Sequence, residues 1–276
     1  PILLMIKVKP LIQFYTAAVA LVISGFIVGE HLNWIHLVTV IWSSISGVFL
    51  IYRFNDYIDG HIDFKFNFRL FFQKRVNLWL VIQFFLFNVP VAIVTLPSFY
   101  FGLFVAIGLI GFSYSIVWKL GAKSYRLKNI FLLKNIIIGV LWGALILLGA
   151  GSLSNPMVYA LFALASIQVA IGSMIRDISD LAIDLSHNVR SVPVVLGKTK
   201  AIYFMHFLNL LTFFIFSFYS DLDLLYLICI IFAWRMINLI GLFKSKKTNF
   251  WGDTFNLLTC SIIMIVVLIQ YFYGAN

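Results

Sequence analysis

Long apolar stretches, separated by short charged or turn-forming segments, make up almost the whole chain. A transmembrane helix needs about 20 mostly apolar residues, and nine such windows occur, at about 10–29, 35–54, 77–97, 98–118, 129–151, 157–175, 200–219, 223–243 and 254–273. Only a short turn near Pro97 joins the third and fourth windows, so eight spans is the alternative. The pattern predicts an all-α integral membrane protein in which residues 1–276 form a single polytopic membrane domain.

The composition agrees with this prediction. Of the 276 residues, 62% are hydrophobic and 11% are charged, and the mean hydropathy is +1.02. An ordinary soluble domain carries roughly 25% charged residues. The chain has too few polar side chains to cover a globule in water, which excludes a water-soluble monomer and a nucleic-acid-binding module. Its two cysteines, Cys229 and Cys260, lie in apolar runs, so neither a disulfide framework nor a cysteine metal site is expected.

The basic residues fall on alternate connections between the predicted spans. One side holds Lys7 and Lys9 and the segments 53–75, 119–128, 176–200 and 244–247, whereas the connections around Glu30, Pro97, Ser154 and Asp221 hold no Lys or Arg. By the positive-inside rule, the N-terminus and the four basic loops are expected to be cytoplasmic. The same asymmetry accounts for the net charge of +10. Within the spans only Lys134 and Arg235 are basic, and each is either a functional residue or a snorkelling side chain.

The acidic residues are concentrated in two short stretches of identical D-x-x-D-x-x-x-D spacing. Six of the ten acids lie in them, namely Asp56, Asp59 and Asp63 after the second window and Asp177, Asp180 and Asp184 after the sixth. In a helix these positions share one stripe, where like charges repel. Bound Mg²⁺, which prefers oxygen ligands, would relieve the repulsion. Two hairpins are therefore expected to face each other across a central cavity, with carboxylate loops at about 55–76 and 176–199.

Solvated loop carboxylates are the ordinary interpretation of a charge run, but two identical triplets in a chain with so few acids favour a metal site. Basic residues occupy the same cytoplasmic loops, namely Lys65, Arg69, Lys74, Arg75, Lys119, Lys123, Arg126, Lys128 and Arg190. Carboxylates and guanidinium groups on one membrane face favour a metal-bridged polyphosphate site over a site for a free cation.

These motifs resemble the signatures of the UbiA superfamily of intramembrane prenyltransferases. The first signature, N-D-x-x-D-x-x-x-D, is matched by Asn55, Asp56, Asp59 and Asp63, and the second by Arg176, Asp177, Asp180 and Asp184, followed by Arg190, Val192-Pro193 and Leu196-Gly197. Tyr114-Ser115 and Lys119 resemble the element at the end of the family's fourth span. The chain departs from the family between Arg69 and Arg75, where the usual prolines are absent.

The resemblance implies Mg²⁺-dependent transfer of a prenyl group from an isoprenyl diphosphate to a lipophilic acceptor within the membrane, through an allylic cation and with release of diphosphate. It implies two Mg²⁺ ions held by Asn55, Asp56, Asp59, Asp63, Asp177, Asp180 and Asp184. It implies catalytic roles for Asp56, Asp59, Asp63, Asp180, Asp184 and Tyr114. It also implies diphosphate contacts from Arg69, Arg75, Ser115, Lys119 and Arg190. His61 and His187 are either bases acting on the acceptor or ordinary loop histidines.

Two other functions stay open at this point. A divalent-cation-coupled transporter also carries repeated intramembrane acids, although here the acids lie at span ends on one side only. A prenyl diphosphate cyclase of the same fold would share the whole site and differ only in its product. Neither the acceptor nor the length of the prenyl chain is predicted by the residues.

Overall fold

The computed structural model describes residues 2–29, 33–58, 86, 88–120, 123–186, 189–219, 222–244 and 248–273. Its long helices are α1 (Ile2–Val28), α2 (Trp34–Ile58), α4 (Ser98–Ser113), α5 (Leu133–Ala150), α6 (Pro156–Ser179), α9 (Lys198–Tyr219), α10 (Leu222–Lys244) and α11 (Thr248–Tyr273). The helical part also includes two short helices, α7 (Leu181–Ser186) and α8 (Val192–Leu196), and a 3₁₀ turn at Leu127–Asn129. Residues 88–95, in the third predicted window, are helical as well.

Five of the described helical segments are long and apolar enough to cross a membrane, namely Trp34–Tyr52, Leu133–Ala150, Pro156–Ser179, Lys198–Ser217 and Leu225–Phe243. Shorter apolar helical segments occur at Gln13–Val28, Ser98–Ser113 and Asn256–Ile269. The prediction of a helical, multi-pass integral membrane protein is confirmed. The count of nine spans stays a prediction, because residues 59–85 lie outside the part of the chain that the structure describes.

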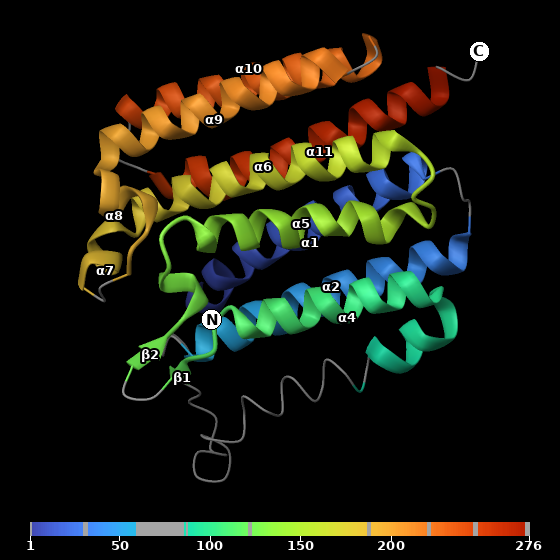
Figure 1. Cartoon of the computed structure of the whole chain (residues 1–276), viewed down its shortest axis with the longest axis horizontal. Helices are drawn as coiled ribbons and strands as arrows, with labels where there is room; N and C mark the ends of the chain where they lie inside the picture. The colour runs from blue at the N-terminus through green and yellow to red at the C-terminus, as the bar shows by residue number, and fades with distance from the viewer. Residues whose placement is uncertain are drawn as a thin grey trace.

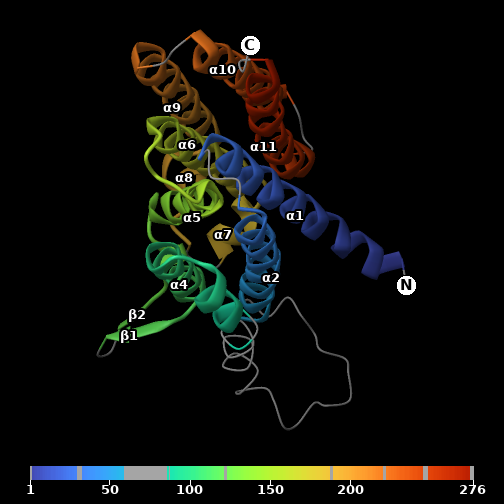
Figure 2. The same cartoon turned by 90° about the vertical axis from the view of Figure 1, so that its right-hand side faces the viewer.

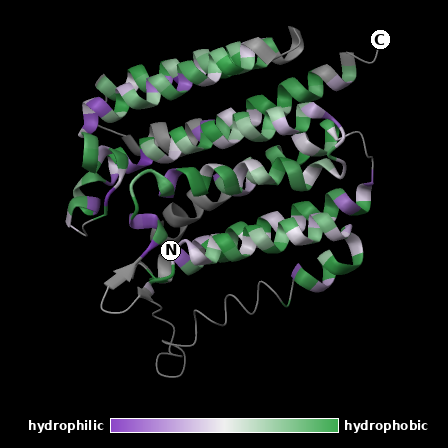
Figure 3. Cartoon of the chain, viewed as in Figure 1, coloured by the Kyte–Doolittle hydropathy of each residue, from purple (hydrophilic) through white to green (hydrophobic). Residues whose placement is uncertain are grey.

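The long helices run side by side, and the polar connections gather at one end of them (Figure 1). In Figure 2, α2 and α4 lie on one side of α5 and α6, whereas α9, α10 and α11 lie on the other. Most hydrophilic positions lie at the end that carries α7, α8 and the strands, and the helices are hydrophobic along their length (Figure 3). This end therefore holds the chemistry-bearing residues.

Helices α1 and α5 approach each other closely through glycines. A Cβ atom at Gly25 or Gly29 would overlap the carbonyl oxygen of Ile146 or Ala150, and one at Gly149 would overlap that of Val22. Small residues at helix contacts are typical of membrane proteins, where close backbone approach provides the packing. The seam between α1 and α5 is thus a fixed part of the scaffold.

A short β-hairpin, which the apolar pattern did not predict, follows α4. Strands β1 (Trp118–Leu120) and β2 (Lys123–Tyr125) pair antiparallel, with Trp118 opposite Tyr125. The fourth predicted window reached residue 118, but α4 ends at Ser113, and the chain turns before it enters β1. The hairpin lies at the polar end of the bundle (Figure 1).

Candidate functional site

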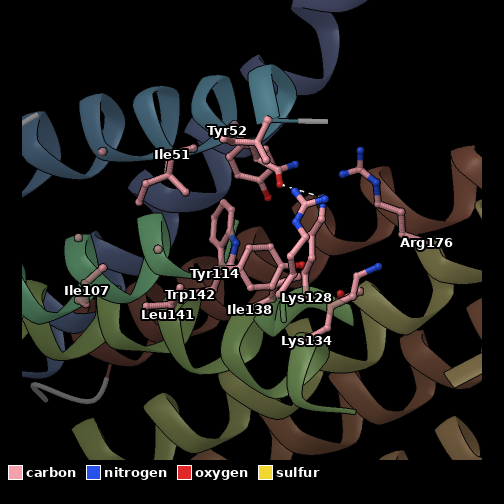
Figure 4. Close-up of a pocket in the computed structure, with 18 of the residues that line it drawn as sticks. Ile51, Tyr52, Ile107, Tyr114, Lys128, Lys134, Ile138, Leu141, Trp142 and Arg176 are labelled. Atoms are coloured by element: carbon pink, nitrogen blue, oxygen red, sulfur yellow. Dashed lines mark hydrogen bonds between the residues drawn. The ribbon is translucent and has the colours of Figure 1, made fainter. Parts of the chain in front are cut away.

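A cavity of about 680 Å³ lies between α2, α4, α5, α6 and α7. One end is polar and includes Asn55, Asp180 and Asp184, and the wall farther along is mostly apolar. Figure 4 shows this division, with Lys128, Lys134 and Arg176 at one end and Ile107 and Leu141 at the other. The cavity can therefore hold a molecule with a strongly anionic head and a hydrocarbon tail.

The end of α2 and the segment after α4 meet at the polar end. Asn55, near the end of α2, accepts a hydrogen bond from the Ser115 hydroxyl (2.8 Å) and a long one from Lys128 Nζ (3.5 Å). Arg126 donates from Nε and Nη2 to the Ser115 carbonyl oxygen, at 3.3 and 3.2 Å. Arg126, Lys128 and Tyr114 all line the cavity. These contacts place two cations beside the end of α2.

The start of α5 supplies the partners of Asp177. Lys134 Nζ lies 2.5 Å from Asp177 Oδ1, and Asn135 Nδ2 donates to Asp177 Oδ2 at 3.0 Å. Leu132, with φ of 62°, turns the backbone just before α5, so Lys134 and Asn135 belong to its first turn. The positive end of a helix dipole also favours a carboxylate there. Both oxygens of the buried Asp177 are therefore engaged by α5.

The other two carboxylates of the second stretch are placed differently. The sequence predicted one helical stripe, but α6 ends at Ser179, Asp180 caps it, and Asp184 belongs to α7. The backbone still closes turns across the junction, because the Asp184 amide donates to the Asp180 carbonyl oxygen (2.8 Å). All three carboxylates line the cavity, so the stripe survives the break.

Asp184 carries the clearest sign of an additional ligand. Its side chain is 8% exposed, and its Oδ2 atom is buried without a hydrogen-bond partner among the described residues. A buried carboxylate oxygen without a partner is costly, and a divalent cation would satisfy it. In the described part of the chain, no three His, Cys, Asp or Glu side chains come together closely enough to hold a metal ion. A complete Mg²⁺ shell would thus need further oxygens, from the first stretch or from substrate.

Several predicted site residues lie outside what the structure describes. Asp56 belongs to α2 and Lys119 to β1, but their side chains are not described, and Asp59, His61, Asp63, Lys65, Arg69, Lys74, Arg75 and His187 lie wholly outside the described residues. Arg190 is exposed and does not line the cavity, and its backbone amide donates to the Asn129 carbonyl oxygen at 3.4 Å. The structure brings together Asn55, Tyr114, Asp177, Asp180 and Asp184.

The sequence analysis did not identify three contributors to the site. Asn135 and Ser173 hold the polar end together, since Asn135 Nδ2 also donates to Ser173 Oγ at 3.0 Å. Trp142 lines the cavity beyond the polar end. The available signal was position: Asn135 follows Lys134 at the start of a span, and Ser173 lies one turn before Asp177.

An aromatic group lies next to the cavity. The rings of Phe14 and Tyr52 stack with centroids 4.5 Å apart, and Trp142 is tilted against Phe14 at 6.1 Å. The Arg176 guanidinium carbon lies 5.9 Å from the centroid of Phe14. Aromatic faces attract cations. This arrangement places π-faces directly beyond the charged end of the cavity, where Tyr52, Tyr114 and Trp142 line it.

Of the two roles that the sequence left open for Arg235, its burial excludes the snorkelling one. It is fully buried, so it does not snorkel, and it does not line the cavity. Its Nε donates to Gln168 Oε1 (3.0 Å), and its Nη2 donates to the Gln168 carbonyl oxygen (2.9 Å) and to Asn256 Oδ1 (3.2 Å). Arg235 thus ties α10 to α6 and α11.

Comparison with known proteins identifies a family profile and solved structures to which the chain is similar. The sequence profile of the UbiA prenyltransferase family matches residues 14–271. A solved digeranylgeranylglyceryl phosphate synthase is similar, with a TM-score of 0.60 and 21% identity over 98% of both chains. Among curated proteins, none matches the chain.

Two archaeal structures are also similar. A UbiA homologue from Aeropyrum pernix K1 has a TM-score of 0.68 and 16% identity, over 94% of this chain and 97% of the other. A UbiA homologue from Archaeoglobus fulgidus, bound to GPP and Mg²⁺, has a TM-score of 0.70 and 17% identity over 96% of both chains. At these identities the structural likeness shows a shared fold.

Proposed function

Because the chain belongs to the UbiA prenyltransferase family, we propose that it transfers a prenyl group from an isoprenyl diphosphate to a lipophilic acceptor within the membrane, and that it requires Mg²⁺. The observation that carries the proposal is the cavity, which joins an end lined by carboxylates and cations to an apolar wall. A prenyl diphosphate has the same division of character. The Archaeoglobus fulgidus relative with bound GPP and Mg²⁺ supports this choice of donor and metal.

We assign the metal to oxygens from both acidic stretches. Asp180 and Asp184 line the cavity, and the buried Asp184 Oδ2 without a partner fits a cation ligand. Asn55, Asp56, Asp59 and Asp63 would supply the facing oxygens, for two ions in all. Bound Mg²⁺ supplies positive charge against the negative charge that develops on the leaving diphosphate. Asp177 differs from the others, because its contacts make it the residue that holds Lys134 in the cavity.

The residues of the chain then act on the donor as follows. Arg126, Lys128, Lys134 and Arg176, which line the cavity, bind diphosphate oxygens, together with Arg69, Arg75 and Lys119 of the predicted set. Ser115, whose hydroxyl donates to Asn55, and Arg190 do not line the cavity, so we leave them out of the diphosphate contacts. The allylic C–O bond breaks, and the diphosphate leaves with the bonding electron pair. Tyr52, Tyr114 and Trp142 present π-faces that stabilise the allylic cation and exclude water. A nucleophilic atom of the acceptor bonds the allylic carbon and loses its proton.

The proposal also includes an orientation of the chain in the membrane. The polar end of the cavity coincides with the basic connections, so we place this end and the N-terminus in the cytoplasm. Single cysteines at Lys123 and Arg190, in a background with Cys229 and Cys260 replaced, should react only with a reagent on the cytoplasmic side. Cysteines at Asn33 and Ser154 should react only from outside. Labelling of Lys123 and Arg190 from opposite sides would contradict a single shared site.

The function is tested with purified protein in detergent, radiolabelled prenyl diphosphates, Mg²⁺ and a panel of lipophilic acceptors. We expect diphosphate release that EDTA abolishes and Mg²⁺ restores, with the label recovered in a prenylated acceptor. Label recovered in a cyclic isoprenoid without an acceptor would instead identify a cyclase. Tight Mg²⁺ binding without turnover of any donor, together with Mg²⁺ flux in vesicles, would identify a transporter and overturn the proposal.

A further inference from the structure

A second, smaller cavity adjoins the large one. It has a volume of about 70 Å³ and lies between α1, α2, α5, α6 and α11. Five residues line both cavities, so the two share a wall, namely Tyr52, Ile138, Trp142, Ser173 and Arg176. At about 10–15 Å³ for each water-sized position, the smaller cavity has room for about five to seven of them. This space is comparable to a single six-membered ring with one substituent.

Two side-chain amides line the smaller cavity, Gln13 from α1 and Asn256 from α11. Asn256 Oδ1 accepts a hydrogen bond from Arg235 Nη2 at 3.2 Å, which leaves the Nδ2 group as the donor for a ligand. The Asn256 amide lies directly against Gly172 of the cavity wall, because a Cβ atom at Gly172 would overlap both of its polar atoms. Gln13 adds a second NH₂ donor and a carbonyl acceptor. The two amides can therefore both donate to a bound molecule and accept from it.

The smaller cavity carries little charge. Of the side chains that line it in the described part of the chain, none is Asp or Glu, and only Arg176 is cationic. Arg176 also lines the large cavity, where the proposed function gives it diphosphate as a partner. A carboxylate or phosphate in the smaller cavity would thus lack a cation of its own, and burying an unpaired charge is costly. A neutral head group with hydroxyl or carbonyl oxygens avoids this cost and matches the amides.

The rest of the wall is apolar and largely aromatic. Phe14 and Tyr52 form a stacked pair, with centroids 4.5 Å apart, and Trp142 is tilted against Phe14 at 6.1 Å. Aromatic side chains pack favourably against a planar ring. Tyr52 and Trp142 belong to the shared wall, and the proposed reaction places them beside the allylic cation. A ring bound in the smaller cavity would therefore lie next to the carbon that it has to attack.

We propose that the smaller cavity binds the head group of the acceptor and that Gln13 and Asn256 select a neutral one. The substrate class is a phenolic ring such as a hydroquinone, whose hydroxyl groups both donate and accept hydrogen bonds. This inference rests on the proposed function, which names no class of acceptor. Gln13 and Asn256 act as specificity residues, because a neutral head satisfies their amides, whereas an anionic head leaves a charge unpaired.

The test compares acceptors with the full chain in detergent, a prenyl diphosphate and Mg²⁺. The acceptors are an alkylated hydroquinone, the matching hydroxybenzoate and a glycerol phosphate lipid. We expect kcat/KM for the hydroquinone to exceed that for either anionic acceptor at least tenfold. An equal or higher kcat/KM for the hydroxybenzoate or for the phosphate lipid would overturn the inference.

Variants of the two amides test the residues themselves. Gln13→Leu and Asn256→Leu should each raise KM for the hydroquinone about tenfold, the effect of a lost hydrogen bond, and leave kcat within twofold. Binding of a prenyl thiolodiphosphate with Mg²⁺ should stay within twofold of wild type, which also shows that each variant is folded. The matched control is Thr16→Val, at an exposed position of α1 that does not line the smaller cavity. An unchanged KM in both leucine variants would contradict the assignment.

A gain of function is expected from added charge. Gln13→Arg supplies the cation that the smaller cavity lacks, so the ratio of kcat/KM values should shift toward the hydroxybenzoate at least tenfold. The same ratio in Gln13→Arg and wild type would show that Gln13 does not meet the acceptor.

The possible failures are distinguishable. A wild-type chain that neither binds the thiolodiphosphate with Mg²⁺ nor turns over any acceptor would overturn the proposed function together with the acceptor site. A wild-type chain that binds the donor analogue and prenylates neutral and anionic acceptors alike would leave the proposed function in place and remove only the selection by Gln13 and Asn256.

Discussion

Two polar clusters lie on helix α6, about two and a half turns apart, and they differ in what they face. Around Asp177 the contacts from Lys134 and Asn135 leave the cluster open to the cavity. Around Gln168 the contacts from Arg235 and Asn209 close on themselves, and none of these residues lines the large cavity. A charge inside a membrane helix is therefore a sign of function only where it meets a cavity. Arg235 uses Nε and Nη2 within the network, and its buried Nη1 atom has no hydrogen-bond partner among the described residues. Away from the cavity, we assign such a charge to the scaffold.

The second cluster extends through four helices. Gln168 Nε2 of α6 donates to Asn209 Oδ1 of α9 at 3.0 Å, and Asn209 Nδ2 donates to the Phe232 carbonyl oxygen of α10 at 3.3 Å. Arg235 adds α11 through Asn256. Because unsatisfied polar groups are costly in the membrane interior, this network stabilises one arrangement of α6, α9, α10 and α11.

The largest expected effect comes from a change in the polar residues that face the cavity. Asp184→Ala removes a carboxylate that we assign to the metal, so turnover should fall about a thousandfold, because the leaving diphosphate loses the positive charge that stabilises it. The melting temperature in detergent should stay close to wild type, since Asp184 Oδ2 makes no hydrogen bond to the described residues. Turnover is measured as diphosphate release. An Asp184→Ala protein with most of its activity would rule out this metal site.

The next largest effect comes from a change in the polar network around Gln168, which joins the helices to one another. Arg235→Met leaves the Gln168 side chain, the Gln168 carbonyl and Asn256 without their donor, so the free energy of unfolding should fall by about 3 kcal/mol. Thermal melts followed by size-exclusion chromatography measure the loss, which should lower the melting temperature by about 10 °C. Turnover per folded molecule should not change. A normal melting temperature combined with lost turnover would place Arg235 in the chemistry.

The third prediction sharpens the comparison inside the cavity. Lys134→Gln should weaken binding of a prenyl thiolodiphosphate about 10- to 100-fold, the effect of one lost charge-assisted hydrogen bond. Asp177→Asn should weaken it less, because the lysine remains but is no longer held in place. Isothermal titration of the single and double variants gives the coupling between the two residues, which should differ clearly from zero. Loss of Mg²⁺ affinity in the Asp177→Asn variant would instead show that Asp177 is a ligand of the metal.

The smallest effect concerns packing beside the second cluster. A Cβ atom at Gly172 would overlap the side-chain amide of Asn256, so Gly172→Ala should lower the free energy of unfolding by about 1–3 kcal/mol. Thermal melting in detergent measures it. Gly102→Ala is the control, since the space around Gly102 is open and its melting temperature should match wild type. Equal melting temperatures for both variants would show that α6 and α11 have room to separate here.

The sequence predicted the helices better than their ends and connections. An apolar run of about 20 residues in a membrane forms a helix, because its backbone polar groups must be hydrogen-bonded within the segment. The windows at 157–175, 200–219 and 223–243 accordingly correspond to α6, α9 and α10. The hairpin at Trp118–Tyr125 escaped prediction, because its two three-residue strands are too short for a pattern of alternating residues to be recognised.

For the site, spacing placed the acids of the second stretch on one cavity wall but did not distinguish among them. Asp177 and Asp184 have the same residue type and similar burial, yet one is paired and one has an oxygen without a partner. That difference arises from Lys134 and Asn135, which are distant in sequence and come close only through packing of α5 on α6. Arg235 illustrates the same limit, because its partners belong to two other helices.

The glycine seam between α1 and α5 also bears on the order in which the protein assembles. Helix α1 ends at Val28 and α5 begins at Leu133, so α1 is synthesised and inserted long before its partner exists. The overlap that a Cβ atom would cause at Gly25, Gly29 or Gly149 means that the two backbones meet directly. During synthesis the glycine face of α1 therefore lacks its partner until α5 has been synthesised, and the two helices pack together only after that.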